Sequence, residues 1–167
     1  MPKNPLQLAV IGGATCDERH QELAHQTGRA IAHAGGILLC GGRGGVMAAA
    51  AEGAVSVGGQ TVGILPGASA TQTPPNPYIG LAIYTGMGQA RNQVLVLSAD
   101  AVIGVGGGWG TLTEIGIALK HGIPVVLLAS WQLERPDGQT ENLLTQAKDP
   151  EEAVRLALQA AGQRSAR

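Results

Sequence analysis

Short apolar runs that end in glycine alternate with helical stretches along this chain, and this alternation constrains the fold more than any other feature. The runs lack a polar residue at every second position, so both faces of each predicted strand must be buried. Strands are predicted at residues 8–11, 37–40, 61–65, 79–84, 101–105 and 125–129. Helices are predicted between them, at residues 18–34, 45–57, 91–99 and 111–121. The sequence therefore predicts an α/β fold, a Rossmann-like doubly wound parallel sheet covered on both faces.

The C-terminal part of the chain continues this domain. Residues 130–148 are polar and are predicted to be irregular, and a helix is predicted over about residues 150–161. Asp149 is placed to cap that helix, with Pro150 at its first position and Glu152 at its third. A chain of 167 residues is of the size of one domain, so we expect a single domain over residues 1–167.

Charge and composition exclude several classes of partner. The net charge of −1 gives no electrostatic reason to expect nucleic acid or an anionic membrane as a partner. The chain has no apolar run of membrane-spanning length and no N-terminal signal segment, so we expect a cytoplasmic protein. Cys16 and Cys40 show neither metal-type spacing nor a disulfide framework, and the four histidines form no ligand cluster. No protein-bound metal is expected.

The 26 glycines gather where the predicted strands end. Ligands of doubly wound sheets bind beyond the carboxyl ends of the strands. Those ends carry Gly12-Gly13, Gly41-Gly42, Pro66-Gly67 and Gly106-Gly107-Gly108, so the glycine clusters are expected to converge on one crevice.

Two of these loops are suited to an anion: GGRGG at residues 41–45 and GGGWGT at residues 106–111. Each precedes a predicted helix, whose free N–H groups and dipole attract negative charge, and glycine lets a phosphate approach the backbone closely. Neither loop has the GxxxxGK[ST] spacing or a clean GxGxxG fingerprint. A small phosphorylated ligand is therefore expected rather than a triphosphate or NAD. The alternative is a pair of tight turns that bind nothing.

Each candidate side chain also has a structural interpretation. Arg43 is either an anion ligand or a surface residue, and Trp109 either a stacking platform or a packing anchor. Glu114 follows Thr111 at capping-box spacing, so it could reach back to the start of its own helix. Arg91 could be a solvated helix residue. No Ser-His-Asp or Cys-His arrangement can be argued from the sequence.

The chain carries three motifs in order: GGRGGVM (residues 41–47), GMGQARN (86–92) and GGGWGTLTE (106–114). Together they resemble the Lonely Guy and molybdenum cofactor carrier superfamily. Members of this superfamily were long mistaken for lysine decarboxylases. The resemblance runs from about residue 8 to about residue 129. With the glycine loops, it implies a ligand and phosphate site formed by Gly12, Gly13, Gly41, Gly42, Arg43, Gly44, Gly45, Asn92, Gly106, Gly107, Gly108, Trp109, Gly110 and Thr111.

Within that superfamily, the Lonely Guy enzymes release the base and ribose 5-phosphate from cytokinin riboside 5′-monophosphates. Their catalytic arginine and glutamate fall on Arg91 and Glu114, which are catalytic here if the chain is a hydrolase. Two positions depart from the hydrolase pattern: Gly106 replaces a proline, and Asn92 replaces a lysine. These departures place the chain closer to the molybdenum cofactor carriers.

We therefore expect a non-enzymatic carrier with molybdenum cofactor as its carried ligand. A nucleoside 5′-monophosphate phosphoribohydrolase is the alternative, and a sensor of another nucleotide-like ligand a third. Lysine decarboxylation is rejected because no lysine can be argued to form the Schiff base that pyridoxal phosphate needs.

The predicted helix at residues 91–99 is apolar around much of its circumference, through Val94, Leu95, Val96 and Leu97. Such a helix must be buried within the fold or between subunits, and the resemblance implies dimers or tetramers. A homo-oligomer that uses this helix is expected. A carrier also implies a molybdoenzyme or a cofactor-synthesis protein as its partner.

Overall fold

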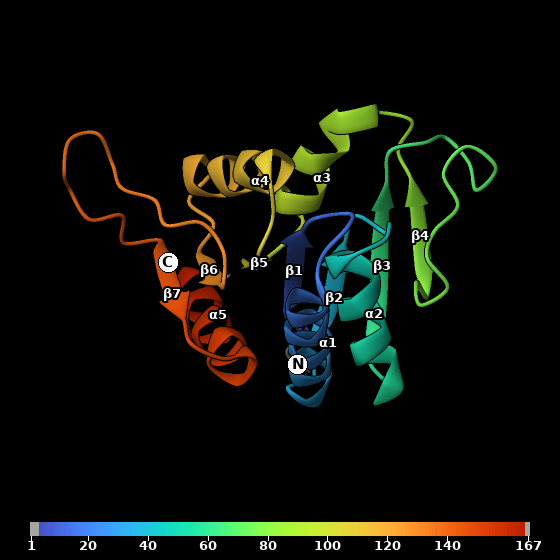
Figure 1. Ribbon diagram of the computed structural model, residues 1–167, viewed down its shortest axis with the longest axis horizontal. Helices are drawn as coiled ribbons and strands as arrows, with labels where there is room; N and C mark the ends of the chain where they lie inside the picture. Colours follow the sequence, from blue (N-terminus) through green and yellow to red (C-terminus); the bar gives the residue numbers. More distant parts are fainter. Residues whose placement is uncertain (1–3, 166–167) are drawn as a thin grey trace.

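The computed structural model describes residues 4–165, which form one seven-stranded parallel sheet with helices packed on it (Figure 1). The strand order across the sheet is β4-β3-β2-β1-β5-β6-β7. The chain thus starts in the middle, runs outward to β4, crosses back to β5 and continues to β7. The predicted doubly wound Rossmann-like fold is confirmed. The strands are β1 (Gln7–Gly12), β2 (Ile37–Cys40), β3 (Gln60–Leu65), β4 (Leu81–Tyr84), β5 (Ala101–Val105), β6 (Val125–Leu128) and β7 (Leu144–Ala147).

The helices divide between the two faces of the sheet. They are α1 (Glu18–His33), α2 (Val46–Ser56), the short 3-10 helix η1 (Gly88–Ala90), α3 (Arg91–Leu97), α4 (Trp109–Lys120) and α5 (Pro150–Ser165). Alternate residues of β1 separate two cores: Leu8 and Val10 pack under α1, α2 and α5, whereas Ala9 and Ile11 pack under α3 and α4. Burial on both faces explains why β1 reads as an uninterrupted apolar run.

Helices α1 and α2 pack unusually close together because glycine replaces a larger residue where they meet. A Cβ on Gly28 would collide with the backbone oxygen of Ala50, and a Cβ on Gly53 would collide with that of His25. Both glycines lie inside helices, where glycine is otherwise unfavourable relative to alanine. Their presence is therefore explained by the close approach of two backbones.

The segment at residues 130–148 differs from the prediction, because it contains the seventh strand. β7 pairs only with β6 and lies at the edge of the sheet. Its sequence, LTQA, is short and half polar, and its side chains are half-buried or exposed. An edge strand covered on few sides needs no apolar run, so the pattern that revealed the other strands was missing here.

The C-terminal helix begins as predicted and extends further than predicted. Asp149 Oδ1 accepts a hydrogen bond of 2.8 Å from the Glu152 amide, and the Glu152 carboxylate accepts one from the Lys148 amide. The capping prediction is confirmed. Helix α5 continues to Ser165 rather than ending near residue 161. Its buried apolar residues, Ala153, Val154, Ala157 and Ala161, pack into the core of the α1 side.

Candidate phosphate-binding pocket

Three glycine loops meet where the strand order reverses, between β1 and its neighbours β2 and β5. They enclose a pocket of about 240 Å³. The predicted site residues that line it are Gly12, Gly13, Gly41, Arg43, Arg91, Asn92, Gly108, Gly110, Thr111 and Glu114. The loop at Pro66-Gly67 does not line this pocket. We call the buried residues Arg91, Asn92 and Glu114 the pocket floor, and the exposed residues Arg43, Gly108 and Gly110 the pocket rim.

The remaining predicted glycines shape the loops without lining the pocket. Gly42, Gly45, Gly106 and Gly107 all adopt positive φ, a conformation that other residues rarely take. Gly44 lies in an adjoining cavity of about 320 Å³, which shares Arg43 with the pocket and is otherwise lined by residues 72–76. The side chain of Asn76 fastens this second loop to the first by donating to the backbone oxygen of Arg43.

The rim is built for an anion by the start of α4. Gly108 is the N-cap residue, and no side chain caps the helix there. The first N–H groups of any helix have no partner within the helix. Gly110 and Thr111, both in the first turn of α4, line the pocket. Helix α4 therefore directs unpaired donors and the positive end of its dipole toward the pocket.

Helix α4 begins two residues earlier than predicted, and this overturns the capping-box interpretation of Glu114. Thr111 lies inside the helix and is buried, so it cannot serve as the N-cap. Glu114 has no helix start to reach back to. Instead, its side chain lies in the pocket floor and is only 7% exposed.

Arg91, at the first position of α3, lines the same pocket as Glu114. It is 8% exposed, so the alternative of a solvated helix residue is wrong. Its guanidinium packs directly over Gly41, and a Cβ there would lie 2.8 Å from Arg91 Cζ. Gly41 is needed because its missing side chain makes the space that Arg91 occupies.

Arg91 and Glu114 are both buried away from water, and the charge of each offsets only part of the cost of burying the other. Burial raises the pKa of Glu114 to about 7, and the positive charge of Arg91 offsets only part of this effect. Burial also lowers the pKa of Arg91, which the charge of Glu114 opposes. Within the described residues, no ion pair joins the two side chains.

Three polar atoms near the floor are buried without a hydrogen-bond partner: Arg91 Nε, Arg91 Nη1 and Asn92 Oδ1. Buried polar atoms in native proteins nearly always have partners, and leaving one unpaired costs about 1–3 kcal/mol. All three atoms belong to residues that line the pocket. Cys40 lies below the same loops as a buried thiol, and burial raises its pKa to about 11.

Behind the rim, a histidine supports the loop after β5. His20 in α1 contacts Asp17 Oδ1 through Nδ1 at 2.7 Å and the backbone oxygen of Ala129 through Nε2 at 3.1 Å. Its ring fills the space beside Gly106, where a Cβ would lie 2.6 Å from His20 Cδ2. The Ser130 hydroxyl donates to the Gly106 oxygen on the same loop. No pattern in the sequence indicated this support, because Asp17, His20 and Ser130 belong to no motif.

Trp109 lies beside the pocket but does not line it. The residue is 77% exposed, and its ring stands 5.4 Å from the ring of Trp131, at an interplanar angle of 43°. The pocket lining that sequence analysis missed consists of Ala14, Gln89 and four apolar residues, Val10, Ile11, Met47 and Leu95.

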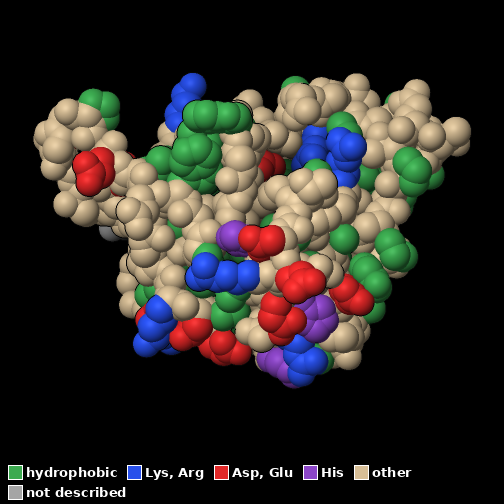
Figure 2. All heavy atoms as spheres, in the orientation of Figure 1, with side chains coloured by type: hydrophobic (Ala, Val, Ile, Leu, Met, Phe, Trp, Pro, Cys, Tyr) green, Lys and Arg blue, Asp and Glu red, His purple; other side chains and the backbone are tan. Residues whose placement is uncertain are grey.

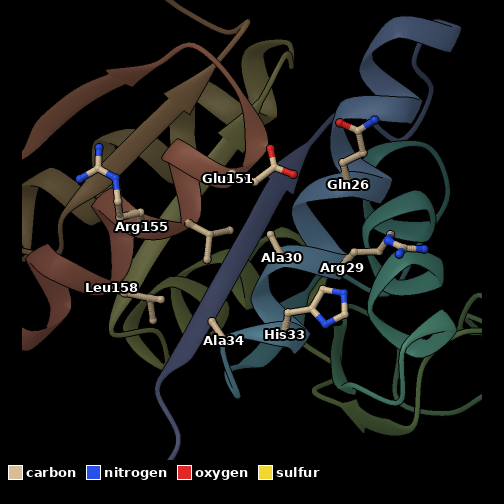
Figure 3. Close-up of a pocket in the computed structure, with 9 residues that line it drawn as sticks. Gln26, Arg29, Ala30, His33, Ala34, Glu151, Arg155 and Leu158 are labelled. Atoms are coloured by element: carbon tan, nitrogen blue, oxygen red, sulfur yellow. The ribbon is translucent and has the colours of Figure 1, made fainter.

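A larger cavity, of about 600 Å³, opens between α1 and α5 (Figure 3). Its labelled side chains include Arg29 and His33 on α1 and Glu151 and Arg155 on α5, around an apolar centre. Acidic, basic and histidine side chains are interleaved over these helices (Figure 2). Because the polar side chains are exposed and of both signs, the cavity lacks the buried, convergent groups of the pocket between the glycine loops.

Two further features bear on the class of site. Between residues 4 and 165, no three His, Cys, Asp or Glu side chains are grouped as a metal ion would require. No helix in that part of the chain is both long and apolar enough to cross a membrane.

Solved structures similar to this one are described as binding molybdenum cofactor. The molybdenum cofactor binding protein of Rippkaea orientalis superposes with a TM-score of 0.84 at 36% identity, over 95% of this chain and 98% of its own. The Moco carrier protein of Chlamydomonas reinhardtii superposes with a TM-score of 0.83 at 33% identity, over 96% and 99% of the two chains.

A hydrolase is a more partial match. The cytokinin riboside 5′-monophosphate phosphoribohydrolase of Mycobacterium tuberculosis is 33% identical over 117 residues, which cover 66% of this chain and 63% of the hydrolase. The SLOG cluster4 family matches residues 5–158, nearly the whole chain. Together with the fold and the three motifs, this match shows that the chain belongs to the SLOG cluster4 family.

Proposed function

We propose that this protein binds and carries molybdenum cofactor, a phosphorylated pyranopterin, as its cargo. The observation that carries the proposal is the similarity, over almost the whole length of both chains, to proteins described as binding or carrying this cofactor. The pocket supports it physically. Its rim offers helix N–H groups and Arg43 to a phosphate, and charge-assisted hydrogen bonds of this kind are the strong ones.

A phosphoribohydrolase is the second candidate, and one observation favours it. Arg91 and Glu114 lie in the same pocket floor, and the pKa of Glu114, about 7, is suited to proton transfer at neutral pH. Against it stands Asn92, which places a neutral amide in the floor where the hydrolases that this chain resembles have a lysine. Losing that cation weakens stabilisation of charge in a transition state without removing the phosphate-binding rim.

Two measurements separate the candidates. Mass spectrometry of the native protein purified from its own source identifies the ligand that it holds, and titration with molybdenum cofactor measures saturable binding. In parallel, the protein is incubated with AMP and cytokinin riboside monophosphates. A carrier gives saturable cofactor binding and no ribose 5-phosphate. Enzymatic release of ribose 5-phosphate that disappears in Glu114→Gln would establish the hydrolase instead.

We also propose that a second copy of the chain covers the outer part of the α3 face. Val62 and Ile64 of β3 pack into the core under α3. The strand register pairs Val62 with Leu81 and Ile64 with Ile83, so the two β4 residues lie on the same face of the sheet. Leu81, Ile83 and Leu97 of α3 are all exposed large apolar side chains. Exposed apolar side chains on one face are typical of association sites. A carrier assembled in this way would deliver its cargo to a molybdoenzyme or a cofactor-synthesis protein.

A further inference from the structure

The pocket floor is polar but poorly suited to an anion. Glu114 brings a carboxyl group, and Asn92 contributes a neutral amide. A phosphate dianion at this depth would lie beside Glu114, and like charges repel strongly where water is excluded. The phosphate is better served at the rim. The floor combines the guanidinium of Arg91, the carboxyl of Glu114 and the amide of Asn92, and it therefore favours a neutral group that both donates and accepts hydrogen bonds.

The walls next to the floor narrow the choice of that group. Ile11, Met47 and Leu95 line the same pocket, so an occupant meets apolar side chains on its flanks. A polyol would lose hydrogen bonds to water against such walls, at a considerable free-energy cost. A planar heterocycle instead buries its faces against them and keeps its polar atoms at the edge. The floor then meets that edge.

The size of the pocket indicates that it takes only part of its ligand. Its volume of about 240 Å³ lies below the range of roughly 300–1,000 Å³ that is common for ligand pockets. The adjoining cavity of about 320 Å³ shares Arg43 with it and offers room for the remainder. A ligand with a ring system in the pocket and its phosphate at the rim near Arg43 fits this arrangement.

We propose that the pocket floor recognises the N–H and C=O edge of a pterin ring, and that Glu114 determines this specificity. Glu114 accepts from the ring N–H and amino groups, Arg91 donates to the ring carbonyl oxygen, and the Asn92 amide pairs with the adjacent edge atom. This assignment rests on the proposed function and adds the orientation of the cargo: heterocycle inward and phosphate outward.

The test uses two probes that differ at one position and carry no phosphate. In 6-hydroxymethylpterin the ring bears an amino group, and in 6-hydroxymethyllumazine an oxygen replaces it. Calorimetric titration of the full chain should show the pterin binding at least about tenfold more tightly, because the lumazine sets an oxygen against Glu114 and loses a donor. Inorganic phosphate is titrated separately to report on the rim.

Glu114→Gln should reduce pterin affinity about tenfold and bring it near that of lumazine, because an amide replaces the carboxyl that accepts from the amino group. Glu18→Gln, the same change at an exposed residue of α1 outside the pocket lining, is the matched control and should keep the wild-type preference. The wild-type ratio decides the question even if Glu114→Gln fails to fold.

Equal affinity for the two probes would overturn the assignment. The assignment would also be overturned if the protein bound phosphate but neither of the two probes. That result would leave the proposed phosphate site at the rim intact. Loss of phosphate binding as well would count against the proposed function itself.

Discussion

Replacing Glu114 by glutamine should stabilise the protein above neutral pH and change its stability little in acid. Burial raises the pKa of Glu114 from 4.5 to about 7. Below pH 4.5 the carboxyl is protonated in both folded and unfolded chains, so burial carries no charge penalty. Between the two pKa values the unfolded chain ionises and the folded chain does not. Stability therefore falls as pH rises through this window and levels off above pH 7.

The size of the effect follows from the two pKa values. Each pH unit between them is worth about 1.4 kcal/mol, so the ionised Glu114 costs the folded state on the order of 3 kcal/mol at pH 8. Glutamine has nearly the same shape and no charge to desolvate. The free energy of unfolding of Glu114→Gln should exceed that of the wild type by up to about this amount at pH 8, with the difference shrinking toward zero near pH 4.5.

Urea unfolding of both proteins at pH 5, 6, 7 and 8 measures this difference directly. Other titrating groups are common to the two proteins and cancel in the comparison. A glutamate that served only as a helix cap would behave oppositely, because its removal costs stability by about 1 kcal/mol at neutral pH. A Glu114→Gln protein that is less stable than wild type at pH 8, or a difference that does not vary with pH, would refute the reasoning.

Three further predictions follow from packing. Gly41→Ala should change the unfolding free energy modestly, because the flexible Arg91 side chain can shift, yet weaken 6-hydroxymethylpterin binding about tenfold or more by displacing that guanidinium; unchanged binding in a calorimetric titration would contradict this. Gly28→Ala should lower the free energy of unfolding by about 1–3 kcal/mol, because the added methyl meets the α2 backbone. Gly116→Ala, in open space on α4, should raise it by up to about 1 kcal/mol. Similar effects of the two substitutions in urea unfolding would refute the close-packing argument. Light scattering of the wild type should give a multiple of the 16.9 kDa chain mass, and Ile83→Glu should give a monomer; a monomeric wild type rules out the proposed interface.

The sequence predicted the strands well where burial on both faces produces an uninterrupted run of apolar residues. β1, β2, β5 and β6 are buried on both faces, so each appears as an apolar run. β7 lies at the edge and is half exposed, so Leu144 and its neighbours form no such run. The start of α4 was misplaced because glycine is a poor indicator of a helix start, and the N-cap here is Gly108 without a side-chain cap.

The pocket could be predicted only in part. Glycine loops at strand ends indicate where an anion can bind, and Gly41 and Gly108 do line the pocket. The relation between Arg91 and Glu114 depends on how α3 and α4 pack against each other, which no local pattern records. Desolvation of the floor and the support from His20 are likewise products of tertiary packing.

The pairing of Trp109 with Trp131 gives this protein a built-in optical reporter. The chain has two tryptophans, two tyrosines and no phenylalanine, so its near-ultraviolet emission comes almost entirely from this one pair of rings. Trp109 lies between Gly108 and Gly110, which both line the pocket. A molecule that settles on the rim must alter the surroundings of an indole that is now largely in water. Arrival and departure of cargo can therefore be followed by intrinsic fluorescence in the unlabelled protein, on the time scale of the transfer itself.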